Sequence, residues 1–175
     1  QPHSVMKRLL ATLTLLLTLG LLVPSNAQAQ VSFEVGPRLG VDVSEDITGE
    51  SGEFFLGADV RISSVAFPLI INPAFDYYFV DDSFNFWSLS ANALYPIGVQ
   101  NAVFTPYFGG GVGLYNTSVD GDDSSTDFGL NVLFGAQFLS AGPVSPFVEA
   151  QYSPVFADPK NDNLFSLQGG LLFGF

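Results

Sequence analysis

The 175-residue sequence contains no cysteine, and only five residues are lysine or arginine, against 17 aspartates and glutamates. The absence of cysteine excludes disulfide bonds, thiolate metal sites and cysteine nucleophiles. The shortage of cations argues against nucleic-acid binding, because proteins that bind the phosphate backbone need Lys and Arg to displace its counterions. Charged residues make up 13% of the chain, about half of the roughly 25% found in soluble globular domains. We therefore expect much of the surface to face something other than water.

The first 29 residues have the three parts of a secretory signal peptide. A basic start is followed by an apolar run from Leu9 to Val23 and by a small-residue ending that favours cleavage after Ala29. An uncleaved membrane helix is the alternative, but this run would rise only about 22 Å, short of the roughly 30 Å core of a bilayer. We expect residues 1–29 to be an N-terminal extension and cleavable signal peptide, and residues 30–175 to form one domain.

Beyond residue 30, apolar and polar residues alternate with a period of two, which is typical of β-strands. In the first segment, the odd positions from Val31 to Val43 are all apolar, and the even positions are polar or glycine. A tilted strand needs about 9 to 11 residues to cross a bilayer, and every predicted strand is long enough. The eight predicted strands are 31–43, 53–63, 69–80, 86–95, 104–115, 128–138, 144–154 and 164–175.

The connections between these strands fall into two alternating classes. The acidic connections lie near 44–52, 81–85, 116–127 and 155–163. The uncharged connections lie near 64–68, 96–103 and 139–143. In an up-and-down barrel the two classes lie at opposite ends, and bacterial outer-membrane barrels keep their shorter turns on the periplasmic side. We therefore assign the acidic connections to the cell exterior.

Alternation alone fits either a secreted, soluble, lipocalin-like barrel that binds an apolar ligand inside, or a membrane barrel with its apolar face outside. The apolar face carries more large side chains than the narrow interior of an eight-stranded barrel can hold. Exposing each of them to water would forgo about 1.5 kcal/mol or more, which in sum exceeds a total stability of about 5–15 kcal/mol. The sequence therefore favours an all-β, eight-stranded antiparallel up-and-down transmembrane β-barrel.

The opposite face is rich in glycine and small polar residues, as suits a narrow lumen. It also carries two arginines and six carboxylates, which we predict to form a network of paired charges: Glu34, Arg38, Asp42, Glu53, Asp59, Arg61, Asp76 and Glu149. Each guanidinium offers five donors and can bind several carboxylates at once. A hydrated ion path through the same charges is the alternative, and it would make the protein a narrow porin-like channel for small solutes.

Aromatic residues gather near both ends of the predicted strands, as in the two girdles of transmembrane barrels. Trp87 and Phe128 belong to the predicted outer girdle, and Phe33 belongs to the inner one. Prolines on the apolar face count against strands, because each lacks a ladder donor. Pro37 and Pro73 lie away from the predicted strand ends, so we expect local bulges there.

With these features, the sequence resembles the small eight-stranded outer-membrane barrels of Gram-negative bacteria, the class of the OmpA transmembrane domain, OmpX and the opacity-type surface proteins. The resemblance rests on the signal peptide, on PYFGGGVG at 106–113 and on LQGGLLFGF at 167–175. It implies a multi-pass protein of the outer membrane, in contact with its lipids and lipopolysaccharide. It also implies that the last strand carries the signal read by the outer-membrane assembly machinery, at Leu167, Leu171, Phe173 and Phe175.

We expect no catalysis and no cofactor. Barrels that resemble serine hydrolases need a histidine base, and the only histidine, His3, precedes the predicted mature chain. A catalytic pair of interior carboxylates is the remaining enzymatic alternative. We therefore expect a non-enzymatic outer-membrane protein with a structural or surface-interaction role, whose acidic loops meet an extracellular partner.

One acidic connection could hold Ca²⁺, because Asp120, Asp122 and Asp123 offer hard oxygen ligands. It lacks the distant bidentate Glu of a calcium-binding loop, so we expect a solvated acidic loop and no metal site. Its charge would repel anionic lipopolysaccharide unless divalent cations or salt screened it. Stability or lipid association is therefore expected to depend on Ca²⁺ or ionic strength.

Overall fold

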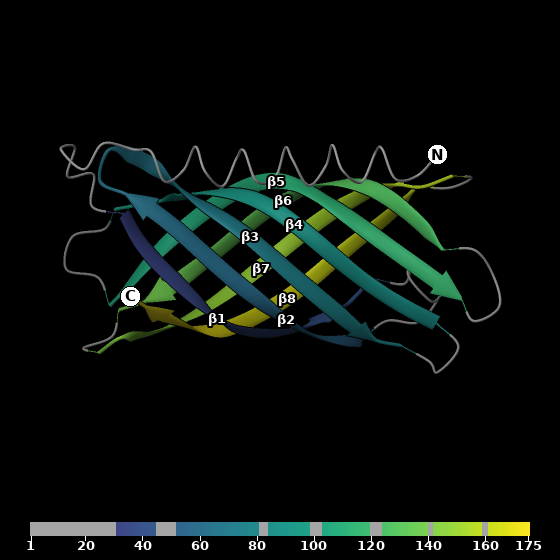
Figure 1. The fold of residues 1–175 in the computed structure, drawn as a ribbon, viewed down its shortest axis with the longest axis horizontal. Helices are drawn as coiled ribbons and strands as arrows, with labels where there is room; N and C mark the ends of the chain where they lie inside the picture. Colours follow the sequence, from purple (N-terminus) through teal and green to yellow (C-terminus); the bar gives the residue numbers. More distant parts are fainter. Residues whose placement is uncertain are drawn as a thin grey trace, which may run out of the picture.

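The structure, a computed structural model, describes residues 31–44, 52–80, 84–98, 103–119, 124–139, 142–158 and 161–175. These residues form eight antiparallel strands in sequence order, and the last strand pairs with the first to close a barrel (Figure 1). The strands are β1 (Val31–Asp42), β2 (Glu53–Ser64), β3 (Phe67–Phe79), β4 (Phe84–Pro96), β5 (Phe104–Val119), β6 (Ser125–Phe138), β7 (Val144–Phe156) and β8 (Asp162–Gly174). The predicted eight-stranded up-and-down barrel is confirmed.

The predicted signal peptide lies outside the described residues. Within the part of the chain that the structure describes, no helix is long and apolar enough to cross a membrane.

Most strand ends fall within two residues of the prediction, but β5 and β6 extend further into the connection between them. β5 continues to Val119 and β6 begins at Ser125, so the predicted bounds of 116–127 for this connection are wrong. The sequence there is mostly polar and shows no clear alternation. The backbone ladder nevertheless continues through Asn116–Thr126 and Thr117–Ser125, and Asn116 Nδ2 also donates hydrogen bonds to Ser125 O (2.9 Å) and Thr126 Oγ1 (2.8 Å) across the two strands.

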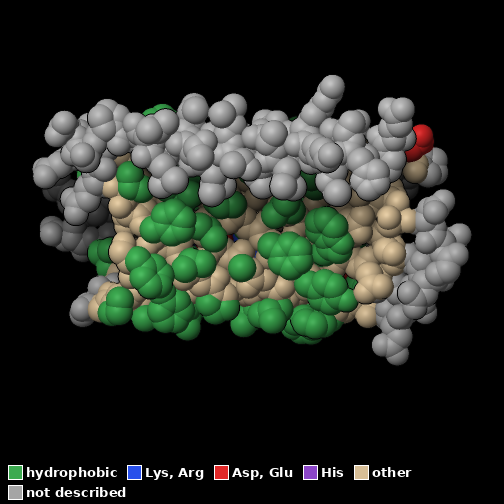
Figure 2. Space-filling view, viewed as in Figure 1, with side chains coloured by type: hydrophobic (Ala, Val, Ile, Leu, Met, Phe, Trp, Pro, Cys, Tyr) green, Lys and Arg blue, Asp and Glu red, His purple; other side chains and the backbone are tan. Residues whose placement is uncertain are grey.

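The outer wall of the barrel is apolar. Figure 2 shows hydrophobic side chains covering the described wall in view, with acidic side chains at one end. Val132, in the middle of β6, is 60% exposed, and Leu39 of β1 is 64% exposed. A soluble barrel with this face inside would bury these two residues, so the lipocalin-like alternative is wrong.

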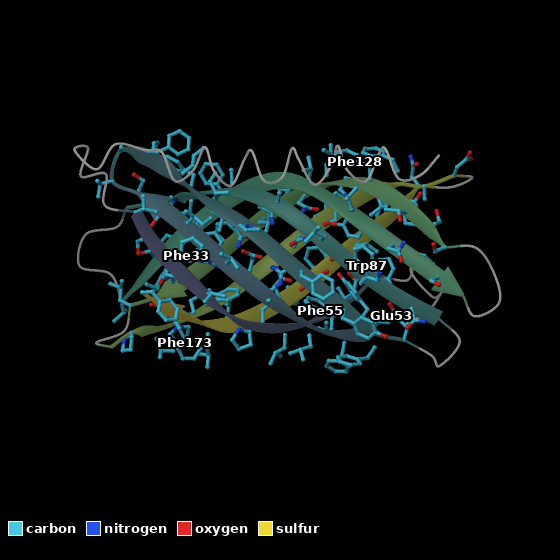
Figure 3. All side chains as sticks on the ribbon, viewed as in Figure 1. Phe33, Glu53, Phe55, Trp87, Phe128 and Phe173 are labelled. Carbon is cyan, nitrogen blue, oxygen red and sulfur yellow. The ribbon has the colours of Figure 1, made fainter. Side chains whose placement is uncertain are left out.

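The two ends of the barrel differ in their connections and are named here accordingly. Trp87 and Phe128 lie toward the end that carries the acidic connections, which we call the acidic end (Figure 3). Phe33 and Phe173 lie toward the opposite end, which we call the uncharged end (Figure 3). Aromatic side chains therefore flank the apolar wall at both ends.

Pro37 and Pro73 lie within strands without the predicted bulges. Pro73 keeps its pairing with Ala91 of β4, and on its other side the ladder with β2 skips two positions without a change of register. Asn72 Nδ2 donates a hydrogen bond to Val60 O (2.9 Å), the carbonyl that the register places opposite Pro73. Pro37 likewise lies at a two-residue gap in the β1–β8 ladder. The expectation of bulges is wrong because each proline lies at a gap in one ladder and keeps its pairing in the other.

Candidate functional site in the barrel lumen

Side chains fill the described lumen in three layers. An apolar cluster lies near the acidic end and consists of Phe55, Tyr78, Phe86, Tyr115, Val155 and Leu164. A second apolar cluster lies toward the uncharged end and consists of Leu94, Tyr107 and Leu133, with Ile70 packed against it. A polar network occupies the space between the two clusters.

The apolar cluster near the acidic end is built largely from aromatic rings. The Tyr78 ring centroid lies 4.9 Å from that of Phe55 and 4.7 Å from that of Phe86. Glycines make room for these rings, because a Cβ at Gly113 or Gly129 would lie 2.7 or 2.8 Å from the Tyr115 ring. The inner-face glycines therefore accommodate bulky aromatic side chains, and the lumen is filled where the sequence alone suggested only that it is narrow.

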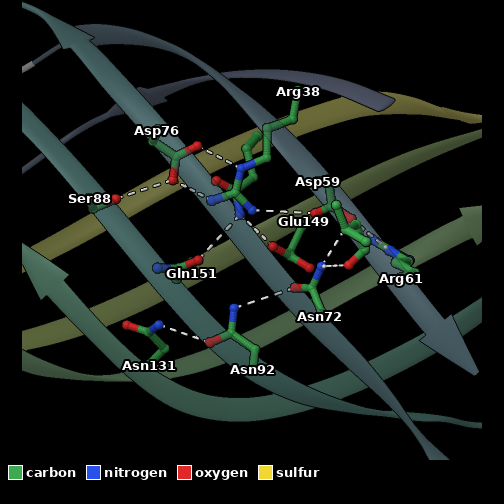
Figure 4. A network of polar contacts seen from close by, with 12 residues as sticks. Arg38, Asp59, Arg61, Asn72, Asp76, Ser88, Asn92, Asn131, Glu149 and Gln151 are labelled. Atoms are coloured by element: carbon green, nitrogen blue, oxygen red, sulfur yellow. Dashed lines mark hydrogen bonds and ion pairs between the residues drawn. The ribbon is translucent and has the colours of Figure 1, made fainter. Parts of the chain in front are cut away.

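Arg38 of β1 is the centre of the polar network (Figure 4). Its Nε donates to Asp76 Oδ1 (2.6 Å) and its Nη2 donates to Asp76 Oδ2, which makes a two-point contact with that carboxylate. Its Nη1 lies 3.4 Å from Asp59 Oδ2. Arg38 is 1% exposed and Asp59 is fully buried. The guanidinium thus joins β1 to β2 and β3 out of contact with solvent.

Arg61 of β2 extends the network toward the uncharged end. Its Nε lies 3.2 Å from Asp59 Oδ1, and its Nη2 donates to the Tyr107 hydroxyl (2.9 Å). The guanidinium carbon lies 4.8 Å from the Tyr107 ring centroid and 4.5 Å from that of Phe147, within the range of cation–π attraction. Tyr107 in turn donates to Glu149 Oε2 (2.9 Å). This second arginine therefore links β2 to β5 and β7.

A chain of amide side chains completes the network across the remaining strands. Asn72 donates to Asp59 (3.0 Å), Asn92 to Asn72 (3.4 Å) and Asn131 to Asn92 (2.9 Å). The Tyr115 hydroxyl donates to Asn131 Oδ1 (2.7 Å), which connects the network to the aromatic cluster. On β8, Gln168 Nε2 donates to Glu149. Side chains from all eight strands are joined in this way.

The eight charged residues predicted for the lumen divide into two groups. Arg38, Asp59, Arg61, Asp76 and Glu149 belong to the central network. Glu34 is linked to it through Gln137, which donates to Glu34 Oε1 (3.0 Å) and accepts from Arg61.

The remaining two carboxylates lie at the acidic end. Asp42 accepts hydrogen bonds from the Ser44 backbone N–H (2.9 Å) and from Ser166 Oγ (2.8 Å). Glu53 lies at the start of β2 at the same end (Figure 3). These partners of Asp42 are serines near the acidic end, and not the two arginines of the central network.

Sequence reasoning missed the amides and the inward-facing aromatic residues. Adjacent aromatic pairs gave a usable signal, because Phe54–Phe55 and Tyr77–Tyr78 place one ring on each face of a strand. No comparable signal marked Asn72, because an inward-facing amide is common in a polar lumen.

The residues of the proposed assembly signal lie outside the lumen. The side chains of the proposed assembly signal are exposed on the outer wall at the C-terminal end of the chain: Leu167, Leu171, Phe173 and Phe175. The weak Ca²⁺ candidates Asp120, Asp122 and Asp123 lie outside the described residues. Among the residues that the structure describes, no group of three or more metal-ligating side chains is found.

The packing limits what the central network can do chemically. Asp59, Asp76 and Glu149 are at most 4% exposed, and they are enclosed between the two apolar clusters. A substrate has no access to these carboxylates from either end without displacing buried side chains. The arrangement is suited to holding eight strands together and to blocking the lumen.

Known proteins share this architecture. The family model for the outer membrane protein beta-barrel domain matches residues 13–171. The chain is similar in structure to Neisserial surface protein A, with a TM-score of 0.66 and 21% identity over 82% of this chain and 97% of that one. It is also similar to a major outer membrane protein from Thermus thermophilus, with a TM-score of 0.58 and 13% identity over 83% of this chain and 99% of that one.

A third similar structure is the N-terminal β-barrel domain of Pseudomonas aeruginosa OprF, with a TM-score of 0.57 and 15% identity over 81% of this chain and 97% of that one. No curated protein matches the sequence. At these identities the structural likenesses concern the fold alone.

Proposed function

Because the chain belongs to the outer membrane protein beta-barrel family, we propose that it is a non-enzymatic integral protein with a structural or surface-interaction role. In this proposal the barrel is a closed scaffold, and the acidic connections outside the cell form the surface that contacts other molecules. The single observation that carries the proposal is the filled lumen, in which a buried ionic network lies between two apolar clusters.

The filled lumen favours this role over the narrow channel. A conducting barrel has a polar, water-filled interior, whereas Tyr78 and Leu94 are 3% and 0% exposed inside this one. Ions would also have to separate Arg38 from Asp76, which are joined by two hydrogen bonds. Breaking a buried pair leaves an uncompensated charge, which costs about 3–5 kcal/mol.

The proposed place of the protein follows from its apolar wall and its two unlike ends. Residues 1–29 would direct export and be removed, and the alternating outward side chains of β8 would be read by the outer-membrane assembly machinery. The acidic end would face outward, beside lipopolysaccharide, where divalent cations or salt screen its charge. The mature chain would keep all 17 acidic residues and three basic ones, Arg38, Arg61 and Lys160.

Single-channel recording in planar bilayers tests the proposal. We expect the folded wild-type protein to give no current steps above the bare-bilayer baseline. A variant in which Tyr78→Ser and Leu94→Ser truncate one side chain in each apolar cluster serves as the control for a loosened lumen. A gel that compares boiled and unboiled samples verifies that both proteins are folded, and regular current steps from folded wild-type protein would contradict the closed-lumen proposal.

A further inference from the structure

A small pocket lies in the mouth of the barrel at its acidic end, and the closed lumen makes no use of it. Its volume is about 140 Å³. Its lining combines an apolar floor with two carboxylates: Phe86, Tyr115, Val155, Leu164, Asp127 and Asp162. The pocket thus offers acidic side chains and apolar surface in one partly open space.

The floor of the pocket is the top of the aromatic cluster that closes the lumen. Phe86 and Tyr115 have ring centroids 6.3 Å apart and an interplanar angle of 22°, so they present stacked rings. Val155 and Leu164 complete the floor from β7 and β8 and are almost fully buried. An apolar cavity of about 150 Å³ holds a benzene ring, so this space suits an apolar group of that size.

The two carboxylates come from β6 and β8, the strands that pair with β7 on its two sides. Asp127 belongs to β6 and Asp162 to β8, and both are partly buried. Asp127 Oδ2 accepts a hydrogen bond from Ser125 Oγ (3.3 Å). Carboxylates at the edge of an apolar pocket attract cations more strongly than carboxylates in open water, because the low-polarity wall weakens screening.

We propose that this pocket binds an organic cation, namely a primary ammonium group carried on a short apolar or aromatic body. The body would pack on Val155 and Leu164, and the cation would be attracted by the two carboxylates and by the faces of the Phe86 and Tyr115 rings. The ammonium could belong to a free amine or to a lysine side chain of an extracellular peptide. The inference rests on the proposed surface role, because it names the chemistry of the partner that the acidic end would meet.

Titration calorimetry on the folded protein in detergent micelles at low ionic strength tests the pocket. Benzylammonium represents the free amine, and Nα-acetyl-lysine amide represents the peptide side chain; benzyl alcohol and benzoate keep the aromatic body without the positive charge. Tighter binding of one ammonium probe identifies the source of the ligand. We expect saturable binding of at least one ammonium probe, and weaker binding of both uncharged and anionic analogues.

Charge-removing variants separate a specific pocket from general attraction by an acidic surface. Asp127→Asn and Asp162→Asn should each weaken ammonium binding by about three- to tenfold. Asp158→Asn is the matched control, because Asp158 is exposed at the same end and does not line the pocket; it should weaken binding by about twofold or less.

Absence of saturable ammonium binding, or equal weakening of binding by all three variants, would contradict the proposal that this pocket binds an organic cation. A folded, non-conducting protein that gives either result overturns the pocket alone and leaves the closed-barrel role intact. Current steps from the wild-type protein would instead contradict the closed-barrel role, whatever the calorimetry shows.

Discussion

Replacing Arg38 with methionine would measure whether the lumen is packed or hydrated. Methionine keeps much of the length of the side chain but removes the charge and every donor. Asp76 would lose two hydrogen bonds and keep the Ser88 hydroxyl, which lies 3.3 Å from Asp76 Oδ2. Asp59 would be affected less, because it still contacts Arg61 (3.2 Å) and Asn72 (3.0 Å).

The expected loss of stability follows from the burial of this pair. Removing one partner of a buried, hydrogen-bonded ion pair costs about 3–5 kcal/mol, because the other charge stays buried without compensation. In a water-filled lumen the same pair would be solvated and worth about 1 kcal/mol or less. Arg38 and Asp76 are 1% and 2% exposed, so we expect the larger value for Arg38→Met.

A double-mutant cycle makes the test specific to this pair. Asp76→Asn in the Arg38→Met background removes the orphaned charge, so the double variant should be more stable than Arg38→Met alone, with a coupling energy of about 2–3 kcal/mol. The measurement is urea-induced unfolding in lipid vesicles, followed by the fluorescence of Trp87, the single tryptophan. Asp158→Asn, an exposed change, should stay within about 0.5 kcal/mol of wild type. A loss below about 1 kcal/mol for Arg38→Met, or no coupling with Asp76, would refute a dry, packed network.

Two further predictions concern the inner and outer faces of the wall. Gly129→Val should destabilise the barrel by about 1–3 kcal/mol through overpacking, because a Cβ at Gly129 would already lie 2.8 Å from the Tyr115 ring. The control Gly98→Ala should be neutral, because a Cβ there meets no atom within 4 Å. Equal urea midpoints for the two variants would contradict the packing at Tyr115. Val132→Arg, in the middle of the outer face of β6, should lower the free energy of unfolding in vesicles by about 2–4 kcal/mol. Phe156→Arg, at the end of β7, should lower it by about 1 kcal/mol or less. The reverse order in the same assay would mean that the bilayer is not centred on the wall as inferred.

Much of the wall could be predicted from the sequence because one physical rule governs it. A side chain on one face of a strand meets lipid and its neighbour meets the lumen, so the alternation from Val31 to Val43 fixes both the strand and its orientation. The same rule failed at the ends of β5 and β6 near Asn116 and Ser125, where the residues are mostly polar. There the backbone ladder continues beside the hydrogen bonds of the Asn116 side chain, and hydropathy alone does not predict either.

The interior was harder to predict because its contacts join residues far apart in sequence. The charges of Arg38 and Asp76 were visible as candidates, but the choice of partners depends on which strands face each other across the lumen. Tyr107 illustrates the limit: its hydroxyl accepts from Arg61 and donates to Glu149, yet it lies in a segment that reads only as aromatic and glycine-rich. Similarly, Asn72 compensates for Pro73 through a carbonyl on the neighbouring strand.

The hydrogen-bonded chain that joins all eight strands also constrains how the barrel can be assembled. An intermediate with only the first hairpin in place would keep Arg38 and Arg61 beside Asp59. It would turn these charges toward acyl chains without Asp76 and Tyr107, which come from β3 and β5. Such a species is strongly disfavoured inside a bilayer. Insertion of individual hairpins one after another is therefore a poor route for this chain, and a concerted crossing, in which the sheet curls shut as it enters the membrane, keeps the charges covered throughout.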